Sequence, residues 1–243
     1  DAVFKQSDFT TKNYIKSFDV ENKTTDFEFN KTDVTGDKEV EGAQLTITDE
    51  DGNVVDQWTS TEKVHSIEGL VVGKTYTLSE TVTAKDYVKA TDIKFTVKNS
   101  SELETVTMKD KQVFVSKTTV GGEEVTGAHM QIIDEDGNII DEWYSEGKSH
   151  IANGLEEGKI YTLHEDLSPL GFNLANDFTF EVTKEKENQT VEMIDTVTEV
   201  NKTDVDGKAV KEATLSIVSE KTKDIVDQWV AGQHILDIDK DIK

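Results

Sequence analysis

The chain has 243 residues, with 50 acidic against 26 basic side chains and a formal net charge of −24. This charge repels phosphate backbones and anionic lipid, so nucleic acid and membrane surfaces are poor candidate partners, and we expect no nucleic-acid binding. No apolar run is long enough to span a membrane, so no membrane insertion is expected. Only 35% of the residues are hydrophobic and none is cysteine, so we predict small modules with thin cores that disulfides cannot staple.

The first strong strand pattern covers residues 27–31. With a period of two, Phe27, Phe29 and Lys31 share one face, which places an amine among core residues. A buried, unpaired ammonium is costly, so Lys31 is expected to have an acidic partner.

Short runs rich in Val, Ile, Thr, Phe and Tyr follow, separated by turn residues at the spacing of a β-sandwich. The Asp51–Gly52 pair favours a tight hairpin turn. Its loop, 49–53, lacks the glycine and glutamate positions of a helix–loop–helix calcium site. We predict a hairpin turn, no metal site and no cofactor, with weak surface calcium binding as the alternative.

Two later strands repeat the pattern of an ionisable residue in line with apolar ones. Glu80 shares its face with Tyr76 and Leu78, and Asp110 ends a strand whose alternate residues are apolar. Lys31 therefore has two candidate partners on separate strands.

The whole arrangement recurs with a period of about 85 residues. We predict an all-β chain of tandem small, Ig-like β-sandwich modules, each with some seven strands. Module 1 spans residues 27–112, module 2 spans 113–197, and a truncated module 3 spans 198–243. In module 2 the three ionisable positions are Lys117, Glu165 and Asp195.

The two ends of the chain are incomplete copies. Residues 1–26 are interpreted as the remnant of an upstream module. In this remnant Asn22 stands at the position that Asp110 and Asp195 occupy in the complete modules, and it could serve as an acceptor for a lysine. Lys202 continues a third strand 198–202, but the glutamate and acceptor strands that would follow it are absent. Lys202 thus matches Lys31 and Lys117 but has no assigned carboxylate partner. A single-turnover ligase between chains would use such ends, although simple truncation explains them with fewer assumptions.

Two chemical interpretations of the three inward groups remain open on the residues alone. The commoner one is a buried ion pair with an extra carboxylate. In the other, the apolar surroundings favour a neutral amine and a neutral acid. The amine then attacks the aspartate, water leaves, and the glutamate shuttles protons.

The motifs Lys-Thr-Asp-x-x-Gly, Gly-Ala, Tyr-Thr-Leu-x-Glu and Val-x-Met-x-Asp, in this order, resemble the collagen-adhesin B-type repeat, also called the SpaA-type pilin domain. The resemblance implies a prealbumin-like sandwich with an autocatalytic isopeptide bond, and it favours this bond over the ion pair. By position, the resemblance implies that Lys31 and Lys117 donate the amine of this bond and that Asp110 and Asp195 are the carboxyl acceptors. It implies that Glu80 and Glu165 are the catalytic residues.

The resemblance also implies a location on the cell wall of a Gram-positive bacterium. We expect a stalk of head-to-tail modules within a longer chain, with host matrix or cell-surface ligands bound by other domains, and no turnover enzyme. The alternative is a direct adhesin, in which a module face binds a host matrix protein or another cell. The recurring Trp58, Trp143 and Trp229 predict packing or edge roles. His65 and His150 are expected on the surface or at strand ends, whereas no companions are recognised for His129, His164 and His234.

Overall fold

The computed structural model describes residues 26–99, 102–232 and 234–235. Within this part the secondary structure is entirely β and forms tandem modules, as the period-two patterns and the repeat of about 85 residues predicted. No helix that could cross a membrane occurs among these residues. The predicted upstream remnant and its acceptor Asn22 lie outside the described residues.

Module 1 is a sandwich of two sheets. One has the order β4-β1-β7 and the other β3-β2-β5-β6. Its strands are β1 (Asp26–Asp33), β2 (Gln44–Thr48), β3 (Val54–Thr59), β4 (His65–Glu68), β5 (Thr75–Val82), β6 (Ile93–Thr96) and β7 (Glu104–Asp110).

The core of module 1 forms between the inward faces of these sheets. Phe27 and Phe29 on β1 meet Leu45 on β2, Leu78 on β5 and Met108 on β7, all of them buried. The alternation predicted for β1 is confirmed, because Phe27, Phe29 and Lys31 are each no more than 2% exposed.

Module 2 repeats this topology, with sheets β11-β8-β14 and β10-β9-β12-β13. Its strands are β8 (Val113–Thr119), β9 (Thr126–Ile133), β10 (Ile139–Glu146), β11 (His150–Ile151), β12 (Ile160–Leu167), β13 (Phe178–Glu181) and β14 (Gln189–Asp195). In both modules the aspartate-rich loop is a hairpin turn. Asp49 Oδ1 accepts hydrogen bonds from the backbone N–H groups of Asp51 and Asn53, and Gly52 has φ of 82°.

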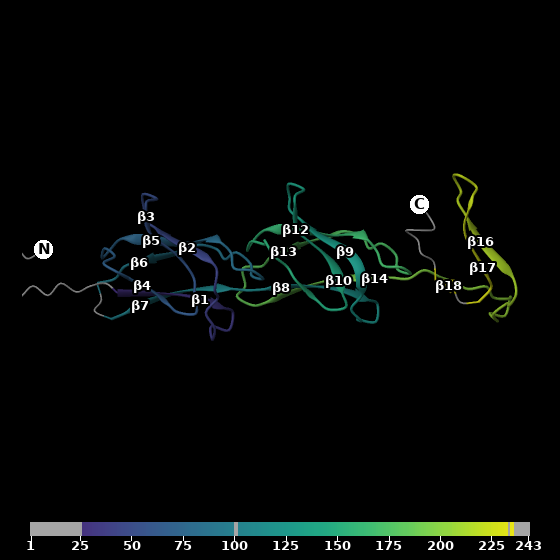
Figure 1. Ribbon diagram of the computed structural model, residues 1–243, viewed down its shortest axis with the longest axis horizontal. Helices are drawn as coiled ribbons and strands as arrows, with labels where there is room; N and C mark the ends of the chain where they lie inside the picture. Colours follow the sequence, from purple (N-terminus) through teal and green to yellow (C-terminus); the bar gives the residue numbers. More distant parts are fainter. Residues whose placement is uncertain (1–25, 100–101, 233, 236–243) are drawn as a thin grey trace, which may run out of the picture.

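The first and last strands of each module pair in parallel, β1 with β7 and β8 with β14. In a parallel pair, the start of one strand and the end of the other lie at opposite ends of the sheet. The chain therefore enters a module at one end and leaves it at the other, and the modules follow one another along the long axis (Figure 1).

Module 3 consists of two small ladders, β15-β18 and β16-β17. Its strands are β15 (Glu199–Val200), β16 (Thr214–Val218), β17 (Ile225–Val230) and β18 (His234–Ile235). None of its described residues is buried. The prediction of a strand that runs through Lys202 was wrong, because β15 ends at Val200 and Lys202 is exposed. The physical reason is that, among the described residues, β15 pairs only with the two-residue strand β18, so no ladder extends through Lys202.

The burial of β12 leads to a stability prediction with a control on the same strand. Leu163 is fully buried, whereas Leu167 is 44% exposed. We expect Leu163→Ala to lower the free energy of unfolding by about 2–5 kcal/mol, because it leaves a cavity. Leu167→Ala should change it by less than about 0.5 kcal/mol. Calorimetric unfolding of the full chain measures both, and equal effects would contradict the assigned face.

Candidate functional site

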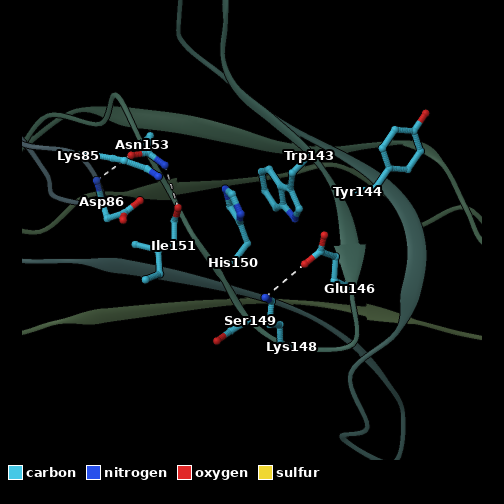
Figure 2. Close-up of a pocket in the computed structure, with 10 residues that line it drawn as sticks. All are labelled: Lys85, Asp86, Trp143, Tyr144, Glu146, Lys148, Ser149, His150, Ile151 and Asn153. Atoms are coloured by element: carbon cyan, nitrogen blue, oxygen red, sulfur yellow. Dashed lines mark hydrogen bonds and ion pairs between the residues drawn. The ribbon is translucent and has the colours of Figure 1, made fainter.

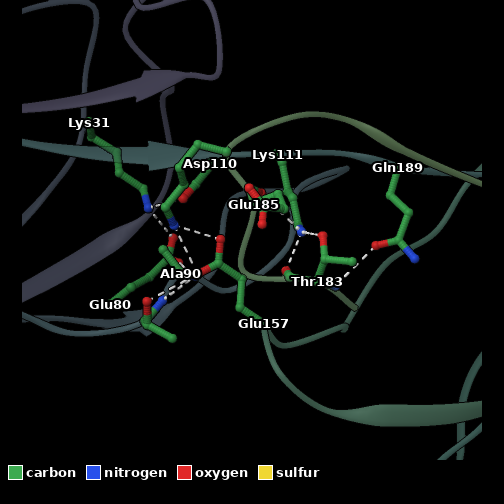
Figure 3. Close-up of polar contacts among 11 residues, drawn as sticks. Lys31, Glu80, Ala90, Asp110, Lys111, Glu157, Thr183, Glu185 and Gln189 are labelled. Carbon is green, nitrogen blue, oxygen red and sulfur yellow. Dashed lines mark hydrogen bonds and ion pairs between the residues drawn. The ribbon is translucent and has the colours of Figure 1, made fainter. Parts of the chain in front are cut away.

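Three buried ionisable side chains meet inside module 1. Lys31, Glu80 and Asp110 are each no more than 1% exposed. Lys31 Nζ lies 2.9 Å from Glu80 Oε1 and makes a closer contact with Asp110 Oδ1. Figure 3 shows the amine pointing at both carboxylates. The grouping predicted from the strand patterns is the one that the structure forms.

Strand register explains how these groups meet. On the β1–β7 ladder Lys31 pairs with Met108, so Asp110 is its diagonal neighbour on the same face. Glu80 comes from β5, in the facing sheet. A long lysine side chain can span the diagonal, and the sandwich brings the glutamate to it from across the core.

A backbone group that sequence reasoning missed holds the glutamate. The N–H of Ala90 donates to Glu80 Oε2 over 2.9 Å, which leaves Oε1 facing Lys31. In module 2, the N–H of Ala175 donates to Glu165 Oε2 over 2.6 Å. In each module the alanine follows the glutamate by 10 residues. This shared spacing is a sequence signal that could have identified the position.

Module 2 builds the same site independently. Lys117 Nζ lies 3.0 Å from Glu165 Oε1 and closer still to Asp195 Oδ1. All three side chains are at most 2% exposed. Two copies with matching atoms in contact make a chance arrangement of surface charges untenable.

Burial changes the protonation of the acids. Desolvation raises the pKa of Asp110 to about 7, against the opposing effect of Lys31 and with a further increase from Glu80. Burial likewise raises the pKa of Glu165 and of Asp195, while Lys117 lowers both. Asp110 Oδ2 and Asp195 Oδ2 are buried and accept no hydrogen bond. A neutral carboxylic acid in contact with an amine is therefore accessible near neutral pH.

The remaining predicted residues are not brought to such a site. Within the described part of the chain, the Lys202 side chain is exposed and meets no carboxylate. No group of three or more metal-binding side chains occurs among the described residues.

The histidines have companions, contrary to the expectation for three of them. His234 pairs with Asp227 and stacks on Trp229, with ring centroids 4.1 Å apart. His129 contacts Asp166 and His164 contacts Asp177. These partners lie on neighbouring strands or loops, so sequence proximity alone did not identify them. The same Asp–His–Trp arrangement is found at Asp56, His65 and Trp58, and at Asp141, His150 and Trp143.

The Trp143–His150 stack lines an open pocket of about 630 Å³ (Figure 2). Lys85 and Asp86 of module 1 form its other side. None of the buried lysines or acids described above lines this pocket.

The family comparison is decisive. A model described as the SpaA prealbumin-like fold domain matches residues 25–112 and, again, residues 111–197. The chain belongs to this family. No curated protein sequence matches it significantly.

Solved structures with similar folds include pilins. The shaft pilin SpaA from Lactobacillus rhamnosus GG is 14% identical, with 71% of this chain and 96% of that chain covered and a TM-score of 0.34. BcpA, the major pilin subunit of Bacillus cereus, is 10% identical, with 71% and 98% covered and a TM-score of 0.31. The Bacillus anthracis TIE protein is 22% identical, with 72% of this chain covered and a TM-score of 0.34. The SpaA modules described here span 34% of that protein's length.

The raised pKa of Asp110 leads to a pH prediction for a variant of module 1 that lacks the buried lysine. In Lys31→Met, Asp110 stays buried, so its folded-state pKa stays above the unfolded value of about 3.9. The folded state then binds more protons than the unfolded state, and the stability of module 1 falls as pH rises from about 4 to 7 and above, because Lys31 no longer lowers the pKa of Asp110. Thermal unfolding across this range measures the fall.

The control for this experiment is Lys31→Met/Asp110→Asn. Its neutral amide does not titrate, so it should lack that part of the pH dependence while keeping Glu80. Parallel pH profiles for the two variants would contradict the assignment.

Proposed function

We propose that each complete SpaA module joins its first and last strands by an isopeptide bond, Lys31 to Asp110 in module 1 and Lys117 to Asp195 in module 2. The observation that carries this proposal is the buried lysine–glutamate–aspartate contact, built twice from the same strands. An ordinary ion pair does not need a second buried carboxylate whose position is held by a backbone N–H.

The bond forms by condensation. The neutral Nζ of Lys31 attacks Cγ of the protonated Asp110, and Glu80 accepts a proton from the nitrogen. Glu80 then returns that proton to the departing hydroxyl, which leaves as water while the C–N amide bond remains. The unbonded Asp110 Oδ2 is suited to be the leaving oxygen, because no hydrogen bond holds it. Glu80 ends as it began, so each module reacts once and no cofactor is consumed.

The bond would carry tension around most of the fold. Because β1 and β7 are parallel neighbours and Lys31 pairs with Met108, Lys31 and Asp110 both lie at the end of the module where the chain leaves it. A pulling force would pass from residue 31 through the amide to residue 110, and the residues between them would bear little of it. By the chain-entropy argument, closing such a loop also contributes about 4 kcal/mol.

The proposed biological role is a stalk on the surface of a Gram-positive bacterium. Membership in the SpaA family and the end-to-end order of the modules support this role. The stalk would hold a binding domain elsewhere in a longer protein away from the cell wall. No turnover chemistry is part of this role.

Intact mass tests the bonds directly. Each condensation removes one water, so the full chain should be lighter than its sequence mass by about 36 Da, or about 18 Da per module. Glu80→Ala should abolish the loss in module 1 alone, and Glu165→Ala the loss in module 2 alone. Each single variant therefore keeps the other module as an internal reference.

A full-length chain at its unmodified sequence mass would disprove the proposed bonds. Mass loss that is unchanged in Glu80→Ala would remove Glu80 from the reaction while leaving the bond itself intact. Peptide mapping of the cross-linked fragments identifies the two joined residues.

Single-molecule pulling tests the stalk role. Lys31 and Asp110 are 79 residues apart, so an unlinked module 1 should lengthen by up to roughly 280 Å on unfolding, at about 3.6 Å per residue. The wild-type chain should show no such step for modules 1 and 2, and Glu80→Ala should show one. Equal extension of the two proteins under force would contradict the mechanical role.

A further inference from the structure

Module 1 inserts a loop into module 2. This loop, residues 83–92, connects β5 to β6 and carries Val88, which is 1% exposed and belongs to the core cluster of module 2. The N–H of Val88 donates to the carbonyl of Lys111, in the connection between the modules, over 2.9 Å. The core of module 2 is therefore completed by a residue of module 1.

Backbone hydrogen bonds fix the loop on both sides of Lys89. Its N–H donates to Leu155 O over 2.8 Å, and its carbonyl accepts from the N–H of Glu157 over 3.1 Å. Nearby, the N–H of Asp86 donates to Asn153 Oδ1 over 2.8 Å. Several residues of module 2 thus hold this one loop of module 1 as a short strand would be held.

Glu157 of module 2 accepts two hydrogen bonds from Thr91 of this loop. Its Oε2 accepts from both the N–H and the hydroxyl of Thr91, each over 3.1 Å. Lys186 Nζ contacts its Oε1 over 2.6 Å, and Glu157 is only 8% exposed. The carboxylate is fully engaged at the junction.

The gripped loop is the one that positions Glu80. Ala90, whose N–H donates to Glu80 Oε2, lies between Lys89 and Thr91, both of which module 2 holds. Figure 3 shows Glu157 close to this group. The charge of Glu157 also adds to the effects that raise the pKa of Asp110.

The peptide that follows Asp110 is fixed by module 2 as well. The fully buried Lys111 directs its Nζ to the carbonyl of Thr183, to Thr183 Oγ1 at 2.9 Å and to the carbonyl of Glu185 at 3.3 Å. The acceptor strand β7 and the glutamate of module 1 are therefore both anchored from outside the module.

We propose that Glu157 is a positioning residue for the cross-linking reaction of module 1, so that Lys31 and Asp110 join efficiently only when module 2 is folded and docked. This inference rests on the proposed isopeptide function and adds an order to it. Docking of the following module would complete the reaction centre of the preceding one, and the bond would then preserve a correctly stacked junction.

Sequence differences between modules 1 and 2 agree with the positioning role of Glu157. At the positions of Glu156 and Glu157, module 1 has Val71 and Val72, which are exposed. The corresponding loop of module 2 is held within the described residues by Thr196, whose carbonyl accepts from the N–H of Asn173 over 2.8 Å. The hydrogen bonds between a glutamate and the loop of the preceding module thus occur at the junction where two complete modules meet.

The test compares the rates of the two cross-links in the full chain. Samples taken at intervals after expression begins are analysed by intact mass and by mapping of the Lys31–Asp110 and Lys117–Asp195 peptides. In Glu157→Ala, cross-linking of module 1 should slow about tenfold or more, since small errors in position cost large factors in rate. Module 2 should react at the wild-type rate. Glu157→Gln, which retains an acceptor for Thr91, should slow module 1 less.

Glu156→Gln is the matched control. It removes the same charge one residue away, where the side chain reaches only Lys89 Nζ at 3.4 Å, and it should leave both rates unchanged. Thr91→Val removes only the hydroxyl contact, so it tests the grip even if Glu157→Ala folds poorly, and it should slow module 1 alone.

The outcomes separate this inference from the proposed function. If wild-type module 1 never loses water, the isopeptide proposal fails and this inference fails with it. If wild-type module 1 is linked but Glu157→Ala and Thr91→Val link both modules at wild-type rates, only the positioning role is overturned. Equal slowing of the two modules would also overturn it, because it would indicate a general folding defect.

Discussion

The contact between a buried amine and two buried carboxylates is the interaction on which each module depends. Removing Lys31 from water is unfavourable, and Glu80 and Asp110 offset that cost only because the sandwich brings them within contact distance. In a chain with 35% hydrophobic residues, a thin core must accommodate this charged group. The same desolvation that makes the contact expensive raises the pKa of Asp110 and makes a neutral acid available. The desolvation that makes the buried contact unfavourable is therefore also what makes the neutral, reactive form of Asp110 available.

Parallel pairing of the first and last strands turns this local chemistry into a property of the whole chain. The pairing sets Asp110 diagonally across from Lys31 and also places the entry and exit of a module at opposite ends. A bond at this site would therefore lie on the line of tension. Only the linker and the first five residues of β8 would separate one proposed bond from the next, so tension would pass from module to module with little load on the remaining strands.

The junction serves a different purpose from the proposed bonds. Val88 completes the core of module 2, and the buried side chains of Lys111 and Glu157 form hydrogen bonds across the boundary. These contacts resist bending and rotation between the modules, whereas a covalent path resists extension. They also explain why the connection between the modules needs few residues: its lysine is part of the interface rather than a flexible spacer.

Sequence alone determined the β class, the period of about 85 residues and the three ionisable positions in each complete module, because alternation in a strand assigns each side chain to one of two faces. Tertiary structure decided which groups touch. Parity cannot reveal that the N–H of Ala90 holds Glu80, that Asp227 and Trp229 accompany His234, or that Glu157 of one module grips Thr91 of another. These contacts depend on how sheets and loops pack across long separations in the chain, and the period-two pattern that orients a side chain carries no information about which loop will meet it.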